Sequence, residues 1–165
     1  MDDGAAAMRS RGMTRRGMLM AGLAALPAGA ALTVIVRPAA ATPEAMQEAI
    51  RRITGGAPLR RGRVRLEIPP LSENGNSVAC AVAVDSPMTA ADHVKAIHVV
   101  TEKNPQPNVI GVHLGPRAGR ARIATRLRLS DTQTVTAIAA LSDGSFWAES
   151  ANVIVTMGAC LEDAL

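Results

Sequence analysis

The sequence predicts an all-β protein, an immunoglobulin-like antiparallel β-sandwich of seven to eight strands that is preceded by one short N-terminal helix. After residue 63, apolar and polar residues alternate in short runs separated by turn residues, as they do in half-buried strands. Seven or eight such runs within about 100 residues are typical of a sandwich. The chain has 165 residues, of which 48% are hydrophobic and 19% charged, so we expect one domain with a buried core.

An export signal is predicted over residues 1–41, before this domain begins. The pair Arg15-Arg16 is followed by an uncharged stretch, 17–36, and then by alanines at 39–41 that offer a small-residue cleavage site. We therefore expect a twin-arginine signal peptide, a periplasmic mature chain that begins at Thr42, and no membrane association after cleavage. A retained membrane anchor is the alternative, because about 20 uncharged residues can span a bilayer.

Composition and charge exclude two classes of partner. Phe146 and Trp147 are the only aromatic residues, so a surface that binds nucleic-acid bases or sugars by stacking is not expected. The net charge of +4 arises mostly in the leader, which holds five of the 18 basic residues and two of the 14 acidic ones. The nearly neutral remainder gives no electrostatic reason to bind nucleic acid or an anionic membrane.

A helix is predicted at the start of the mature chain, over residues 44–53. Thr42 is a capping residue, Pro43 suits the first turn, and Gly55-Gly56 ends the helix. A helix of about three turns is marginal alone and must pack on another surface. We expect its apolar face to supply apolar surface for a partner, and the aromatic pair to pack at a sheet edge or at a partner interface. Four residues at helical spacing form that face: Met46, Ala49, Ile50 and Ile53.

Strands are predicted after the helix, where apolar residues recur at every second position. Apolar residues alternate with charged ones over 64–68, and Pro69-Pro70 ends this strand. Asn74-Gly75 marks a turn, and Asp143-Gly144 marks a tight hairpin that leads into the aromatic pair. Together with the helix, the strands make up a domain over 42–157. The other predicted strands are 77–85, 94–101, 108–114, 121–129, 134–141 and 152–157.

The predicted domain carries little chemistry of its own. It has no nucleophile-elbow, metalloprotease, phosphate-loop or dinucleotide motif, and no cofactor is expected. His93, His98 and His113 lack the spacing of metal ligands, so we expect structural histidines and no metal. A run of arginines has two interpretations that stay open, a solvated strand face or a docking patch for an acidic partner or an anionic substrate. The run comprises Arg117, Arg120, Arg122, Arg126 and Arg128.

The two cysteines differ in their expected environments. Cys80 shares one strand face with three valines, so we expect a small buried side chain with an inert thiol. Cys160 lies beyond the last predicted strand, and Gly158 and Ala159 precede it, which predicts an exposed thiol on a flexible arm over 158–165. In an oxidising compartment a free exposed cysteine is a liability unless it is used. A Cys80–Cys160 disulfide is the alternative, and it requires the tail to fold back into the core.

Several strings distributed along the chain carry a resemblance to one family. From about Glu44 to Cys160 the chain resembles the SoxY family, the carrier subunits of the SoxYZ complex in the periplasmic sulfur-oxidation (Sox) system. The strings include Asn74-Gly75-Asn76, Asp85-Ser86-Pro87-Met88, Lys95-Ala96-Ile97-His98, Glu102-Lys103-Asn104-Pro105 and Asp143-Gly144-Ser145-Phe146-Trp147.

The resemblance implies a carrier protein and not an enzyme. In that family a cysteine near the C-terminus is loaded covalently with thiosulfate, and the matching residue here is Cys160. SoxZ is the implied heterodimer partner. The SoxXA cytochrome forms the link oxidatively, SoxB releases sulfate by hydrolysis, and SoxCD oxidises the remaining sulfane sulfur. The resemblance implies no cofactor in this chain, because the partner enzymes supply the chemistry.

One departure from the family bears on loading. The family ends in Gly-Gly-Cys-Gly-Gly, whereas here Ala159 and Leu161 replace glycines and Glu162 and Asp163 add negative charge. Lost backbone freedom, bulk beside the thiol and repulsion of anionic thiosulfate would each slow loading. The alternative function is therefore an immunoglobulin-like periplasmic adaptor or paralogue that binds SoxZ but is loaded poorly or not at all. A thiol enzyme that pairs Cys160 with a histidine is disfavoured, because a mobile tail does not preorganise such a pair.

Overall fold

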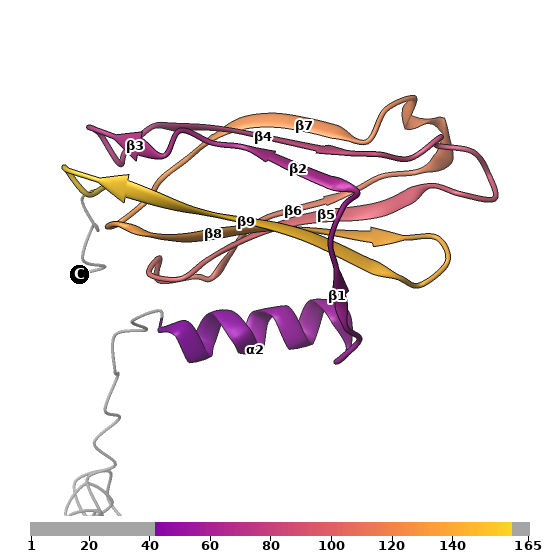
Figure 1. The fold of residues 1–165 in the computed structure, drawn as a ribbon, viewed down its shortest axis with the longest axis horizontal. Coiled ribbons are helices and arrows are strands. Elements are labelled where there is room, and N and C mark those ends of the chain that lie inside the picture. The colour runs from indigo at the N-terminus through magenta and orange to yellow at the C-terminus, as the bar shows by residue number, and fades with distance from the viewer. Residues whose placement is uncertain (1–41, 160–165) are drawn as a thin grey trace, which may run out of the picture. The chain divides into compact units, whose positions relative to one another are not determined.

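Two stacked sheets and one helix make up the computed structural model, which describes residues 42–159. The predicted leader with its cleavage site, and Cys160 with the rest of the tail, lie outside the described residues. The helix lies against the outer face of the larger sheet (Figure 1). Within the described chain no helix is both long enough and apolar enough to cross a membrane. The prediction of an all-β sandwich with one short preceding helix is confirmed.

Six strands form the larger sheet and three form the smaller one, so the described residues hold nine strands and not seven or eight. The larger sheet has the order β1 (Leu59–Arg60), β9 (Phe146–Val155), β8 (Gln133–Leu141), β5 (Val94–Thr101) and β6 (Asn108–His113), and β3 (Leu71–Ser72) also pairs with β9. The smaller sheet has the order β2 (Val64–Glu67), β4 (Val78–Val84) and β7 (Arg122–Leu127). A short 3-10 helix, η1 (Pro116–Ala118), lies between β6 and β7.

The additional strands arise because the chain changes sheets twice between residues 59 and 72. It leaves β1 in the larger sheet, forms β2 in the smaller one, and returns to the larger sheet as β3. Gly62 makes the first crossing with a φ of 116°, a value that side chains disfavour. Pro69-Pro70 makes the second crossing and ends the ladder because proline lacks an N–H. Strands of two residues are too short to show a period, which is why the sequence did not indicate them.

Strand β9 is one continuous element where the sequence predicted two. It pairs antiparallel with β8 from Gln133 opposite Val153 to Ala140 opposite Phe146. Both β1 and β3 pair with β9 in parallel, so the purely antiparallel sandwich of the prediction is wrong at this edge.

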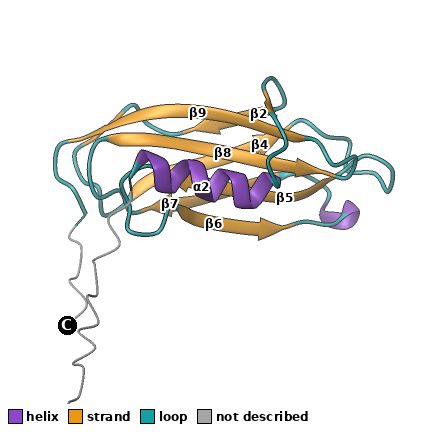
Figure 2. Ribbon diagram, turned by 90° about the horizontal axis from the view of Figure 1, so that it is seen from below, coloured by secondary structure: helices purple, strands orange, loops and turns teal. Residues whose placement is uncertain are grey.

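The predicted helix is present as α2 (Pro43–Thr54). The Ala45 N–H donates to the Thr42 side-chain oxygen at 3.3 Å, and Gly55 ends the helix in the left-handed conformation with a φ of 63°. The helix lies across the larger sheet (Figure 2). Its apolar face packs there, with Met46 in one cluster with Val100 and Ile138. The larger sheet is therefore buried on both faces, by α2 on one side and by the smaller sheet on the other.

Candidate functional site

The residues that lead into Cys160 form the candidate site, because the predicted attachment residue itself lies outside the described residues. We call this region the tail exit. It comprises Gly75, the loop at Leu129 and Ser130, and the segment of Met157, Gly158 and Ala159. Gly75 belongs to the turn before β4, and Leu129 and Ser130 belong to the connection from β7 to β8.

Backbone hydrogen bonds join the three segments of the tail exit. The Gly75 N–H donates to the Met157 carbonyl oxygen at 2.7 Å, and the Leu129 N–H donates to the Gly75 oxygen at 2.8 Å. The Ala159 N–H donates in turn to the Leu129 oxygen at 2.9 Å. The predicted Asn74-Gly75 turn supports this arrangement, since the Asn74 side-chain oxygen accepts from the Asn76 N–H at 2.9 Å. The end of the described chain is thus fixed to the sandwich by main-chain atoms.

Two glycines allow this close approach of the backbones. A Cβ atom at Gly75 would meet the Leu129 carbonyl oxygen and would lie 2.8 Å from the Ala159 nitrogen. A Cβ atom at Gly158 would collide with the Ser130 carbonyl oxygen. Neither glycine has a positive φ, so the requirement for glycine is one of space.

A buried amide supports the loop from beneath. The Asn104 Nδ2 donates to the Arg128 carbonyl oxygen at 2.6 Å, and its Oδ1 accepts from the Ser130 N–H at 3.1 Å and from the Gln133 Nε2 at 2.9 Å. Gln133 is only 2% exposed, and its Oε1 accepts from the Lys103 N–H at 2.8 Å. The strings Asn74-Gly75-Asn76 and Glu102-Lys103-Asn104-Pro105, distant in sequence, therefore meet at the tail exit.

The predicted flexible arm began at Gly158, but the structure holds its first two residues against the sandwich. Gly158 lies directly against Ser130, and Ala159 is 9% exposed with its N–H bonded. Any free arm therefore starts after Ala159. Whether residues 160–165 form such an arm stays a prediction.

Cys80 has the environment that the sequence predicted. It is 3% exposed within the core between the sheets, opposite Thr125 of β7. Burial raises the pKa of the Cys80 thiol above its ordinary value, which keeps it protonated and weakly nucleophilic.

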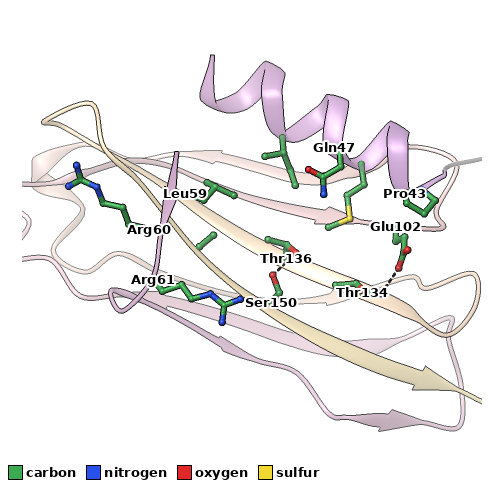
Figure 3. Close-up of a pocket in the computed structure, with 12 residues that line it drawn as sticks. Pro43, Gln47, Leu59, Arg60, Arg61, Glu102, Thr134, Thr136 and Ser150 are labelled. Atoms are coloured by element: carbon green, nitrogen blue, oxygen red, sulfur yellow. Dashed lines mark hydrogen bonds between the residues drawn. The ribbon is translucent and has the colours of Figure 1, made fainter. Parts of the chain in front are cut away.

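A pocket of about 330 Å³ lies between α2, β1 and the face of β8 and β9 that α2 covers (Figure 3). Two pairs of its polar groups bond to each other: the hydroxyls of Thr136 and Ser150 are 2.8 Å apart, and Glu102 accepts from the Thr134 N–H at 3.2 Å.

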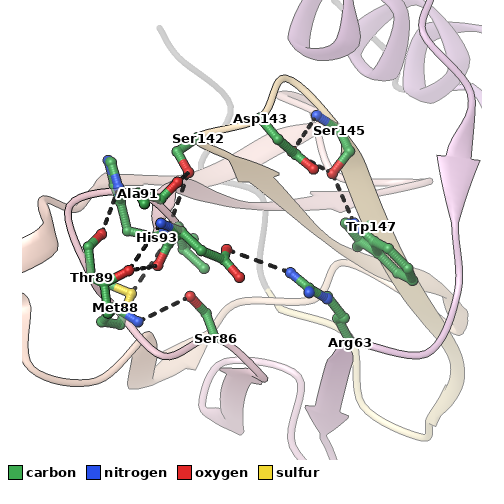
Figure 4. Close-up of polar contacts among 12 residues, drawn as sticks. Arg63, Ser86, Met88, Thr89, Ala91, His93, Ser142, Asp143, Ser145 and Trp147 are labelled. Atoms are coloured by element: carbon green, nitrogen blue, oxygen red, sulfur yellow. Dashed lines mark hydrogen bonds and ion pairs between the residues drawn. The ribbon is translucent and has the colours of Figure 1, made fainter.

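The opposite end of the sandwich, where the β8–β9 hairpin turns, is held by side chains (Figure 4). We call it the hairpin end. The Ser142 hydroxyl accepts from the His93 N–H and donates to the Ala91 carbonyl oxygen, both at 3.1 Å. The Trp147 Nε1 donates to the Ser145 hydroxyl at 2.9 Å, and that hydroxyl donates to the Asp143 carboxylate at 2.7 Å. The string Asp143-Gly144-Ser145-Phe146-Trp147 thus stabilises a turn.

The apolar features expected to bind a partner pack largely within the chain, and their contact with a partner stays a prediction. Phe146 packs with Met46 and the rest of the helix face on the larger sheet. Trp147 packs against the main core, and the guanidinium groups of Arg63 and Arg60 lie 5.4 and 5.9 Å from its ring centroid. Exposed large apolar side chains occur instead at Leu59, Leu71, Ile154 and Met157.

Two residues of the arginine run lie exposed on the smaller sheet, and both interpretations of the run stay predictions. Arg126 donates to the Ser77 hydroxyl at 3.2 Å, and Arg122 pairs with Glu67 at 3.7 Å on the exposed face of the smaller sheet. Burial and the neighbouring His113, whose ring centroid is 6.3 Å away, lower the pKa of His98. Among residues 42–159, no three His, Cys, Asp or Glu side chains gather as metal ligands would.

Sequence reasoning missed Gly75, Asn104 and Ser130 as parts of one site. Asn74-Gly75 carried a turn signal, but nothing in the pattern indicated that the C-terminal segment would lie on that turn. The only available signal was the presence of Gly75 and Asn104 in strings that resemble one family.

Comparisons with known proteins agree with this fold. The family model of the sulfur oxidation protein SoxY matches residues 50–160. The solved sulfur carrier protein SoxY from Chlorobium limicola f thiosulfatophilum is 23% identical, with a TM-score of 0.58 over 69% of this chain and 98% of that chain. A superoxide reductase (neelaredoxin) from Ignicoccus hospitalis is 17% identical, with a TM-score of 0.51 over 57% of this chain and 80% of that one.

Identities this low show the fold alone, and a search of the curated proteins finds no match. The family model nevertheless spans most of the domain and includes both cysteines. The chain therefore belongs to the SoxY family of sulfur oxidation proteins.

Proposed function

We propose that this SoxY protein carries sulfur intermediates of thiosulfate oxidation on the thiol of Cys160, as a heterodimer with SoxZ in the periplasm. Membership of the family supports a sulfur-carrier role. One observation in the structure carries the assignment to Cys160. The other cysteine, Cys80, is buried with a raised pKa, which disfavours it as the attachment residue, and Cys160 is the remaining thiol of the chain.

The chemistry requires only a thiol from this chain. In the loading step the Cys160 thiolate and the terminal sulfur of thiosulfate form a sulfur–sulfur bond, and the two electrons released pass to the SoxXA cytochrome. SoxB then hydrolyses the bond between the sulfane sulfur and the sulfonate, which releases sulfate and two protons and leaves a persulfide on Cys160. SoxCD oxidises that sulfur further. Tethering keeps each intermediate at high effective concentration for the next enzyme.

The position of the tail exit disfavours the alternative disulfide. Ala159 is bonded to Leu129, which lies four residues along the chain from Thr125, the partner of Cys80. Four residues of extended strand span about 13 Å. A disulfide needs Cα atoms within about 7 Å of one another, and consecutive Cα atoms are about 3.8 Å apart. A Cys80–Cys160 bridge would therefore require residue 160 to fold back along β7 toward Thr125.

Intact mass spectrometry of the SoxYZ complex tests the proposal. After exposure to thiosulfate and SoxXA we expect a thiosulfonate adduct, which peptide mapping places on Cys160, and addition of SoxB should convert it to a persulfide. Cys160→Ser should abolish the adduct, and Cys80→Ser is the matched control that should retain it. No adduct on the native complex with active enzymes would contradict the proposal.

The same experiment separates the carrier from the adaptor that binds SoxZ without loading. An adaptor should form the complex with SoxZ but stay unloaded. Replacing Leu161 with glycine and deleting the last three residues should then restore loading, whereas a competent carrier should gain little from that change.

A further inference from the structure

We propose that His98 and His113 form a binding site for a divalent transition-metal ion such as Zn²⁺ on the outer face of the larger sheet. The proposed carrier function requires no metal in this chain, so the inference goes beyond that function. Three observations support it: the two histidines lie close together, one of their nitrogens is buried without a partner, and an open pocket lies beside it.

The register of the larger sheet brings the two histidines together. His98 of β5 lies opposite Gly111 of β6, and His113 lies two residues farther along β6, opposite Ala96. Residues two apart on a strand project from the same face, and the two ring centroids are 6.3 Å apart. Gly111 leaves the room that the His98 ring fills, because a Cβ atom there would lie 3.4 Å from its Nδ1.

The separation of the rings suits one ion that both of them bind. A zinc–nitrogen bond is about 2.1 Å long, so the centroids of two rings that share an ion lie at most about 6.6 Å apart, and about 5.4 Å apart at a tetrahedral angle. The observed 6.3 Å lies between these values. His113 is exposed, so rotation of its ring can supply the remaining movement of about 1 Å.

One nitrogen of the pair lacks a partner. The Nδ1 of His98 is buried, and among residues 42–159 it makes no hydrogen bond. A buried polar atom without a partner costs free energy, and a bound ion is one way in which proteins satisfy such an atom. By contrast, the Nδ1 of His93 lies 3.1 Å from the Thr89 carbonyl oxygen and needs no further partner.

The charge state of the pair favours a cation over an anion. Burial, and after it the neighbouring His113, lower the pKa of His98, although Asn108 opposes this shift. The His98 ring is therefore neutral near neutral pH, and the neutral imidazole is the form that binds metal ions. An anion would instead require the protonated ring, which this environment disfavours.

A pocket of about 600 Å³ lies beside the His98 ring, between α2 and residues 105–108. It leaves space for the water molecules that complete the coordination of an ion with two protein ligands. Arg52 also lines this pocket, but its charge is offset by Glu48, which lies 3.2 Å away. Two histidines and water make an open site, which differs from the closed four-ligand sites of structural zinc.

Titration with Zn²⁺ tests the site, with the histidine rings observed in long-range ¹H–¹⁵N spectra. The SoxYZ complex is the sample, or the mature chain alone if no complex forms, so the result does not depend on the carrier function. We expect the ring nitrogens of His98 and His113 to shift together until the site is saturated, and those of His93 to stay unchanged. Shifts of equal size at all three histidines would contradict the proposal.

Isothermal titration calorimetry of variants provides the second measurement. His98→Gln and His113→Gln should each weaken Zn²⁺ binding by about tenfold or more, because the loss of an outer-shell partner alone costs a metal site about that much. His93→Gln is the matched control and should bind as the native chain does. If His98→Gln does not fold, the exposed His113 still decides the question. Equal affinities of the native chain and a folded variant of either ligand would show an adventitious ion only and overturn the proposal.

Discussion

The two ends of the sandwich are held together in different ways. At the tail exit, three distant segments are joined by main-chain hydrogen bonds from Gly75 to Met157, from Leu129 to Gly75 and from Ala159 to Leu129. At the hairpin end, the contacts run through side chains, with the Ser145 hydroxyl between Trp147 and Asp143. The tail exit requires glycine, which has no side chain, at positions 75 and 158. The hairpin end requires the particular side chains that form its hydrogen bonds.

The difference indicates which end tolerates change. A lost hydroxyl at the hairpin end removes one or two partly exposed hydrogen bonds, which water can replace. A side chain added at the tail exit must move the backbone. We therefore expect single substitutions at the hairpin end to lower the stability only slightly. Substitutions of glycine at the tail exit should instead displace the backbone around Ala159.

The largest expected effect concerns the buried amide beneath the tail exit. Asn104→Ala leaves the Arg128 carbonyl, the Ser130 N–H and the Gln133 amide without their partner, which should lower the free energy of unfolding by about 2–3 kcal/mol. Ser142→Ala at the hairpin end is the comparison and should cost about 1 kcal/mol. Urea unfolding followed by circular dichroism measures both. Equal losses would remove the distinction between the ends.

A smaller effect is expected from the only tryptophan. Trp147→Leu removes the stacking with Arg60 and Arg63 and the hydrogen bond to Ser145, and should lower the free energy of unfolding by about 1–2 kcal/mol. Trp147→Phe retains the ring face and should cost less. Neither variant should slow the loading of Cys160, because the strand extends about 26 Å from Trp147 to Val155. Slower loading in a folded Trp147→Leu protein would show that the two ends are coupled.

The smallest expected effect is the loss of stability when two carboxylates, Asp131 at one end of the sandwich and Asp143 at the other, become protonated. The pKa of Asp131 is lowered from its ordinary 3.8, chiefly by the hydrogen bond from Lys103, and that of Asp143 is lowered chiefly by the hydrogen bond from Ser145. Because each folded pKa lies below the unfolded value, each carboxylate stabilises the fold above pH 3.8. That stabilisation is lost as the pH falls through the folded pKa.

Carbon-13 titration of the carboxyl groups separates the two causes. Lys103→Met should return the midpoint of Asp131 toward 3.8 and leave Asp143 unchanged, and Ser145→Ala should do the reverse. A Lys103→Met protein in which the midpoint of Asp131 does not move would show that the ion pair at the tail exit has no effect.

The sequence predicts what local chemistry encodes, and much of this fold is of that kind. Thr42 and Gly55 define the helix, and the valines of β4 placed Cys80 in the core. The surface that receives the helix face was not predicted, although β5 carries a signal of it. Its nearly continuous apolar run reflects burial on both faces, with Val99 toward the smaller sheet and Val100 toward α2.

The tail exit could not be predicted in the same way. Its contacts are made by backbone atoms, which every residue carries, and they join segments that a linear pattern does not relate. The glycines at 75 and 158 do not by themselves indicate such contacts, because glycine also serves turns and flexible arms. The interpretation of Gly158 as part of an arm followed the commoner use of the residue.

The parallel pairs on β9 bear on how this protein avoids unwanted association. Strand β1 covers one end of the outer edge of β9 and β3 covers the other, so a foreign strand cannot lie along its full length. Within residues 42–159 the larger sheet has its one uninterrupted border along β6, from Asn108 to His113. A polypeptide that extends this sheet through its main chain would therefore dock at β6, away from the strand that leads to the thiol.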